Sequence, residues 1–275
     1  MKNNFLKEIP SLIYCIAMIL MVTLPLFFCL VNSFRSLSDL LRGFFVIPKE
    51  LTIDNYIYII ADRGIMRYLL NSLLITSIGV LLSFLINPFV AYMIAINWEK
   101  KTYRFLYYFL SACMFIPGNL LVFPLIKMYY AMGLMNIVGL LIYYAVILIP
   151  ETVFMLVPYF RTFNREIGEA AQLDGCSSFQ LYYRVFMPVC KPFILAIMIL
   201  NAIWLWNDFF MPLMILNKNP DTWTLPIFIY NFLGRNSFKK NYAFASCQIA
   251  LLPIIVFYGV FHKKIISGLN MKAKQ

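Results

Sequence analysis

The run SLIYCIAMILMVTLPLFFCLV, residues 11–31, carries no charged side chain. An α-helix rises about 1.5 Å per residue, so roughly 20 apolar residues suffice to cross the hydrocarbon core of a bilayer. The run is too long for the apolar region of a secretory signal, and no small-x-small cleavage pattern follows it. We therefore expect a retained first membrane span here.

Similar apolar blocks recur along the whole chain. Hydrophobic residues make up 62% of the 275 residues and charged residues only 13%, whereas soluble domains carry about 25% charged residues. Because no linker or low-complexity stretch divides the chain, we expect one membrane domain over residues 1–275. The sequence predicts an all-α integral membrane protein with six transmembrane helices at about 10–33, 70–96, 105–130, 137–160, 188–213 and 242–262.

Basic residues give the chain a net charge of +11, but they lie between the apolar blocks rather than on one face. Nucleic-acid binding is therefore not expected. Lys100, Lys101, Lys263 and Lys264 sit close to expected span ends, and such residues favour the cytoplasmic side. This placement predicts a multi-pass protein of the cell membrane with both termini in the cytoplasm.

The sequence lacks the residue patterns that several chemical functions need. The six cysteines are scattered and the single histidine, His262, stands beside two lysines, so neither a metal site nor a disulfide framework is indicated. No GxxxxGK(S/T) run occurs, so the chain itself is not expected to bind ATP. No set of catalytic residues is visible, and we expect no enzyme activity.

The inner connection at 161–187, RTFNREIGEAAQLDGCSSFQLYYRVFM, predicts two short helices. Asn164 is placed to cap the first, and Gly175 is placed to end it in the left-handed conformation. Ser177 with Gln180 predicts a capping box for the second. The first helix is too short to be stable alone in water, so it needs a docking surface.

The stretch GEAAQLDGCSSFQLYYRVFMPVCKPF (168–193) resembles the EAA loop of binding-protein-dependent ABC importer permeases. The matching pattern is Glu-Ala-Ala, a Gly four residues later, then an apolar residue and Pro. Other segments are similar to the carbohydrate-uptake branch, in the style of the smaller maltose-type permease subunit. The resembling positions are Glu169, Ala170, Ala171, Asp174, Gly175, Met187 and Pro188, with NSLLITS (71–77), AYMIA (91–95), MFIPGNLLVFPL (114–125), GLMNIVGLL (133–141), WNDFFMPL (206–213), TLP (224–226) and FHKKIISGLN (261–270).

The chain also departs from that pattern. Asn87-Pro88 interrupts the second expected span, where small residues are usual in the family. The chain stops at NMKAKQ, whereas many relatives end in a tail that contains Gly and Lys. Because of this different C-terminal sequence, contacts between the C-terminus and the ATPase stay an open question.

The resemblance implies a type I ABC importer permease fold with a cytoplasmic coupling helix. It implies a second permease as heterodimer partner, a cytoplasmic ATPase dimer that binds ATP-Mg, and an extracellular solute-binding protein that delivers a sugar. No cofactor is expected in this chain itself, and its remaining partner is membrane lipid. The implied coupling residues are Glu169, Ala170, Ala171, Asp174 and Gly175.

Ionisable residues inside spans are costly and are candidates for function. Glu151 lies well inside the fourth expected span, and Asp208, beside Asn207, lies near the outer end of the fifth. These three residues are possible pathway or gate residues. Nearby tryptophans and phenylalanines fit sugar contact, an interfacial belt or simple packing, with belt or packing preferred.

Two alternatives stay open. The first is an ABC importer permease for another solute, such as glycerol phosphate or a polyamine. The second, from another class, is a secondary transporter, which would need acidic ion sites and usually an internal repeat. Neither feature is visible in the sequence. A membrane-embedded enzyme is disfavoured for lack of clustered polar residues in the spans.

Overall fold

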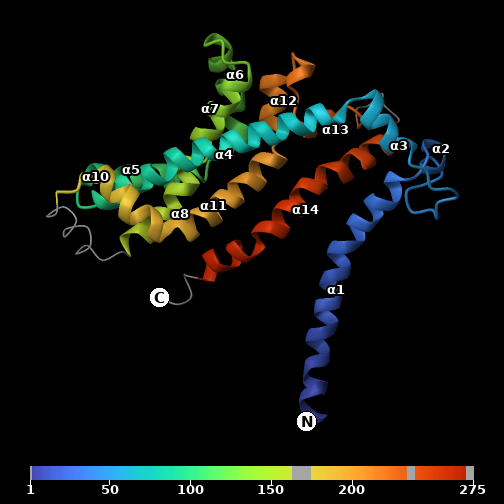
Figure 1. The fold of residues 1–275 in the computed structure, drawn as a ribbon, viewed down its shortest axis with the longest axis horizontal. Coiled ribbons are helices and arrows are strands. Elements are labelled where there is room, and N and C mark those ends of the chain that lie inside the picture. The colour runs from blue at the N-terminus through green and yellow to red at the C-terminus, as the bar shows by residue number, and fades with distance from the viewer. Residues whose placement is uncertain (1, 163–174, 234–238, 271–275) are drawn as a thin grey trace. The chain divides into compact units, whose positions relative to one another are not determined.

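The computed structural model describes residues 2–162, 175–233 and 239–270 (Figure 1). In these parts the chain is helical and contains no strand, which confirms the all-α expectation. The chain divides into two compact units. The first, unit 1, consists of residues 1–67 with 227–255, and the second, unit 2, consists of residues 68–226 with 256–275.

The long helices account for most of the fold. In chain order the elements are α1 (Lys2–Ser33), α2 (Leu37–Leu40), α3 (Asp54–Ile57), η1 (Tyr58–Asp62), α4 (Ile65–Ile96), α5 (Lys101–Cys113), α6 (Gly118–Ala131), α7 (Ile137–Ile147), α8 (Ile149–Arg161), α10 (Ser178–Leu181), η2 (Tyr182–Phe186), α11 (Met187–Asn207), α12 (Phe210–Leu216), η3 (Pro220–Thr222), α13 (Leu225–Tyr230) and α14 (Lys240–Asn270).

Five helical stretches are long and apolar enough to cross a membrane. They are Pro10–Ser33, Ile65–Ile96, Ile137–Arg161, Ser178–Asn207 and Lys240–Val260, and each overlaps an expected span, although the expected fifth span ends at Asn207 rather than at 213 because Asp208 is extended. The remaining expected span, 105–130, is divided between α5 and α6. Pro117 lies at this break; it has no N–H for a helical hydrogen bond and disfavours helical geometry in the residue before it.

Prolines also mark smaller irregularities. The fourth span is interrupted at Leu148, where α7 ends and α8 begins with Pro150 in its first turn. The fifth span was expected to open at Pro188. Instead the helix starts at Ser178, and a turn of π-helix, η2, precedes Pro188. Such a turn absorbs the missing proline hydrogen bond without ending the helix.

In unit 1, a buried arginine organises the segment after α1. The Arg35 guanidinium donates to Asp39 Oδ2 at 2.7 Å and to the Asp39 carbonyl at 2.8 Å. It also donates to Asn32 Oδ1 at 2.9 Å and to two further backbone carbonyls. Hydrogen bonding to Arg35 holds the pKa of the Asp39 carboxyl below its usual range. Asp39 therefore stays ionised, and the pair closes this turn.

Asn55 connects three parts of the same unit. Its side-chain amide donates to the carbonyls of Ser33 at 2.8 Å and Arg35 at 2.9 Å, and its oxygen accepts from Asn241 Nδ2 at 2.6 Å. The side chain is buried, with 3% of its surface exposed. The end of α1, α3 and the start of α14 are thus joined through one amide.

Replacing Asn55 with leucine should lower the melting temperature of the purified protein. The change leaves buried carbonyls and the Asn241 amide without a partner, at a cost of about 1–3 kcal/mol for each unpaired group. The measurement is thermal unfolding in detergent. The control is Asn217→Leu, because that side chain is exposed. Equal melting temperatures for the two variants would contradict the connecting role of Asn55.

Candidate coupling and pathway sites

The inner connection is described up to Thr162 and again from Gly175. Glu169, Ala170, Ala171 and Asp174, which the resemblance marks as coupling residues, lie outside the described residues. Gly175 has φ +79°, so it adopts the left-handed conformation expected for it. Ser177 and Gln180 form the predicted capping box at the start of α10. Both local predictions at this end of the connection are confirmed.

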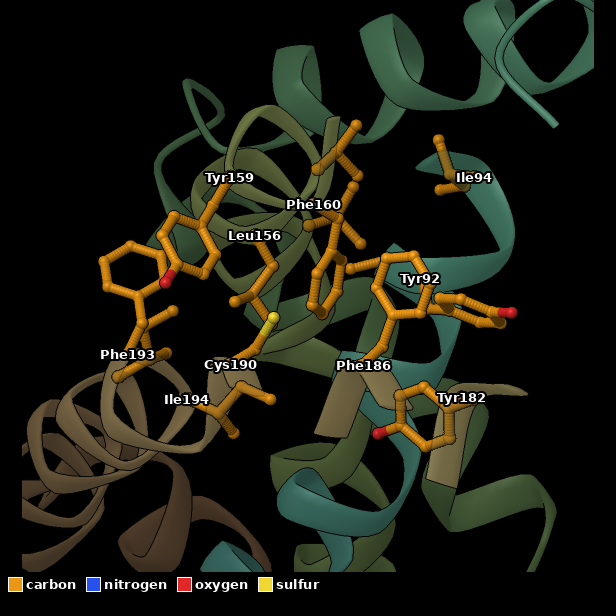
Figure 2. Packing of buried hydrophobic residues seen from close by; sticks show 14 of the residues in the cluster. Tyr92, Ile94, Leu156, Tyr159, Phe160, Tyr182, Phe186, Cys190, Phe193 and Ile194 are labelled. Carbon is orange, nitrogen blue, oxygen red and sulfur yellow. The ribbon is translucent and has the colours of Figure 1, made fainter. Parts of the chain in front are cut away.

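Aromatic side chains hold the end of the connection against α4 within unit 2 (Figure 2). The Tyr92 ring lies 4.9 Å from that of Phe186 and 5.1 Å from that of Tyr182, measured between centroids. Its hydroxyl donates to the carbonyl of Ser178 at 3.1 Å. Tyr92 itself is fully buried. The start of the fifth span is therefore packed on α4 through rings and one hydrogen bond.

The other end of the connection is held by a cation–π contact. The Arg161 guanidinium, in the last turn of α8, lies 3.9 Å from the centroid of the Trp98 ring. Trp98 follows α4 and packs edge-on against Tyr107 of α5, a helix that lies beside α8. The described residues on both sides of segment 163–174 thus pack into the same aromatic core of unit 2.

Asp208 is the best-defined candidate pathway residue. It caps the end of α11, accepts the Phe210 N–H at 3.1 Å and accepts the Tyr144 hydroxyl of α7 at 3.0 Å. Tyr144 is buried, and its ring meets Trp204 edge-on with centroids 6.3 Å apart. The Asp208 carboxylate therefore links the end of α11 to Tyr144, which lies inside the fourth span.

Asn207 and Glu151 are placed differently from Asp208. Asn207 is exposed, and its amide donates to the Ile203 carbonyl of its own helix at 2.8 Å. Glu151 lies in the first turn of α8 and is half-buried. Within the described part of unit 2, no hydrogen bond or ion pair is recorded for its carboxylate. Asn207 and Asp208 are neighbours in the sequence but have separate hydrogen-bond partners, and no hydrogen bond or ion pair of the described residues joins Glu151 to either.

Several residues that build these sites were not singled out from the sequence. Tyr92, Trp98 and Tyr144 occur in aromatic-rich apolar stretches, where each resembles ordinary core or interfacial packing. Their partners lie at sequence separations of 86 for Tyr92 and Ser178 and 64 for Tyr144 and Asp208. Only their hydroxyl and indole groups, which need a partner when buried, give a signal.

Tyr92 should carry much of the stability of this aromatic core. We expect Tyr92→Ala to cost about 3–5 kcal/mol, as for other large-to-small core changes. Tyr92→Phe removes only the hydrogen bond to Ser178 and should cost about 0.5–1.5 kcal/mol. The measurement is denaturant unfolding monitored by tryptophan fluorescence. Tyr183→Ala, at an exposed neighbouring ring, is the control; a loss there as large as for Tyr92→Ala contradicts the assignment.

Comparison with known proteins identifies the family of this chain. The family model for the binding-protein-dependent transport system inner membrane component matches residues 87–270. The multiple sugar-binding transport system permease protein MsmG of Streptococcus mutans is 36% identical over 253 residues, with 91% of each chain covered. The diacetylchitobiose uptake system permease protein NgcG of Streptomyces coelicolor is 29% identical, with 90% of this chain and 83% of that protein covered.

A solved structure shares the fold. One chain in the crystal structure of a bacterial ABC transporter involved in the import of the acidic polysaccharide alginate superposes with a TM-score of 0.81 at 20% identity. The match covers 96% of this chain and 98% of the other. The relatives are named as permease proteins, which are membrane subunits without catalytic activity of their own. This chain belongs to the binding-protein-dependent transport system inner membrane component family and is an ABC transporter permease.

Proposed function

We propose that this chain imports a sugar or oligosaccharide as one of two permease subunits of an ATP-driven transporter. The observation that carries the proposal is the 36% identity to a multiple sugar-binding permease along 91% of the chain. A second relative, named as a probable starch degradation products permease from Thermoanaerobacterium thermosulfurigenes, is 27% identical with 89% of each chain covered. Relatives with sugar-related names thus align with almost the whole chain.

We propose that the partners are a second permease, a cytoplasmic ATPase dimer and an extracellular solute-binding protein. ATP-Mg is bound by the ATPase and not by this chain. Segment 163–174 docks on the ATPase, and its movement passes to α4, α8 and α11 through the aromatic core around Tyr92. The Arg161–Trp98 contact brings the end of α8 to the basic stretch at 98–104. That cluster of basic residues supports a cytoplasmic position for this end and for both termini.

Changes in the docking segment should uncouple transport while leaving the protein in the membrane. Glu169→Arg reverses a charge offered to the ATPase, and Gly175→Leu strains a left-handed position by about 1–2 kcal/mol. We expect both variants to lose sugar uptake in proteoliposomes that contain the full transporter. A cysteine at position 175 should crosslink to the ATPase. Gly133→Leu is the matched control, because Gly133 has φ +69° and also has open space around it.

The same assay identifies the solute class. Unlabelled oligosaccharides should compete with a labelled sugar, whereas glycerol phosphate and polyamines should not. Competition by either of those solutes instead would assign the chain to another importer class. Uptake that persists without ATP and follows an ion gradient would indicate a secondary transporter. Normal uptake by Glu169→Arg and Gly175→Leu, with no crosslink to the ATPase, would show that this segment does not couple the permease to the ATPase.

We further propose that Asp208 and Asn207 belong to the outer gate and that Glu151 lines the pathway. The Asp208–Tyr144 hydrogen bond supports the gate, because it links the end of α11 to α7, and we expect these two helices to separate when a solute enters. Glu151 supports a pathway role, because an ionisable group at this depth needs polar surroundings.

Breaking the gate should alter how the binding protein stimulates ATP hydrolysis. We expect Asp208→Asn and Tyr144→Phe to raise basal ATPase activity several-fold and to reduce stimulation, since either change weakens the same closed contact. The preferred sugar should not change. Glu151→Gln should instead raise the KM of uptake. If Asp208→Asn changes the preferred sugar while the binding protein still stimulates ATP hydrolysis normally, Asp208 is a specificity residue. If neither property changes, Asp208 acts only as a helix cap.

A further inference from the structure

Three buried polar side chains face one another between α4 and α11 in unit 2. Asn87 and Ser83 lie one helical turn apart on α4, and Asn201 comes from α11. Their exposed fractions are 0%, 0% and 1%. Asn87 Nδ2 donates to Ser83 Oγ at 2.7 Å, and Asn201 Nδ2 approaches the same oxygen at 3.5 Å. We call these three residues the polar seam.

The polar seam cannot satisfy its own hydrogen bonds. Asn87 Oδ1 and Asn201 Oδ1 have no partner among the described residues, although both atoms are buried. Rotating either amide by 180° does not solve this. The Ser83 hydroxyl supplies only one hydrogen, so it can donate to one asparagine oxygen and never to both. As the three side chains stand in the structure, their own contacts leave both asparagine oxygens without a donor, and the Ser83 hydroxyl could serve only one of them.

Unpaired acceptors are costly in this location. Both helices belong to stretches long and apolar enough to span a membrane, where lipid offers no hydrogen-bond donor. Pro88, directly after Asn87, lacks the N–H that would bond the carbonyl of Phe84 one turn earlier. The carbonyl of Phe84 thus adds a third acceptor, beside the two asparagine oxygens, that lacks its usual donor at this level of α4. A single water molecule supplies two donated hydrogens, and two to four polar partners are typical of a buried water.

We propose that Asn87 and Asn201 bind a water molecule between α4 and α11, and that this hydrated polar seam lets the two helices shift during transport. The inference rests on the proposed transport function. The water donates to both asparagine oxygens and accepts from an amide hydrogen. A displacement of less than 1 Å would bring Asn201 Nδ2 from 3.5 Å to an ordinary hydrogen-bond distance from Ser83 Oγ. The one hydrogen bond of the seam that joins the two helices is therefore at the long limit, and a small shift of α11 against α4 would make or break it.

Leucine replacements of Asn87 and Asn201, made singly and together, distinguish a role of the seam in helix movement from a role in stability alone. The variants are Asn87→Leu, Asn201→Leu and the double variant, each in the complete transporter. Each single change leaves the other asparagine with fewer hydrogen-bond partners in a buried position and should lower the melting temperature. The double change removes both orphaned oxygens and should recover most of that loss, because replacing all partners by apolar groups is nearly neutral. Uptake by the double variant should nevertheless stay at least about fivefold below wild type, within the usual range of coupling effects.

The control is Thr152→Val on α8. Thr152 is fully buried and its hydroxyl also has no partner among the described residues, but it lies on α8 and shares no hydrogen bond with the polar seam. This variant should keep both its melting temperature and its uptake. The water is tested separately by a cryo-electron microscopy map of the nucleotide-free transporter, which should show density within hydrogen-bond distance of both asparagine oxygens.

Several results would overturn the proposal. Wild-type uptake by the stable double variant would make the seam dispensable for movement. Additive losses of stability, without recovery, would mean that Asn87 and Asn201 share no network. A map that resolves other buried waters but shows none between Asn87 and Asn201 would contradict the proposed water site. A wild-type transporter that takes up no sugar contradicts the proposed function alone, because the melting temperatures and the map still test the hydrated seam without any solute.

Discussion

The constraint on which this structure depends is the absence of water in the bilayer core. Every backbone N–H and carbonyl in a span must find its partner within the protein, and an α-helix satisfies this requirement locally. The described chain accordingly consists of helices and short connections. The same constraint explains where the helices break. At Pro117 a backbone hydrogen bond is missing, and the expected third span becomes two helices. At Pro188 a π-helical turn keeps the helix continuous.

The constraint also gives meaning to the few polar side chains within the bundle. In a soluble protein an unpaired asparagine is often near water, whereas here each polar group must be matched by another part of the molecule. The Asp208–Tyr144 pair joins α11 to α7, and the polar seam joins α11 to α4. Contacts of this kind suit a transporter, because they can exchange partners as helices move while apolar packing merely slides.

Much of this picture follows from the sequence by itself. Apolar runs longer than a bilayer is thick determine the membrane class and five of the helices. Local hydrogen-bond chemistry determines the left-handed Gly175 and the Ser177–Gln180 capping box, since all atoms involved lie within a few residues. The likeness of the inner connection to the EAA loop led to the family, which the comparison of 87–270 with the family model confirms. The coupling role of Glu169, Ala170, Ala171 and Asp174 stays a prediction.

Other features were decided only by the tertiary structure. Tyr92, Trp98, Tyr144 and Asn201 look like ordinary members of aromatic or apolar stretches, and their roles come from partners 63 or more residues away. The sequence marked Asp208 as a polar group near a span end but could not tell that it meets Tyr144. Periodicity and composition describe each helix alone, whereas the pairing of helices depends on which side chains fit together in three dimensions. That is why the sequence alone determined the spans and the family, and only the folded chain showed which polar groups meet between them.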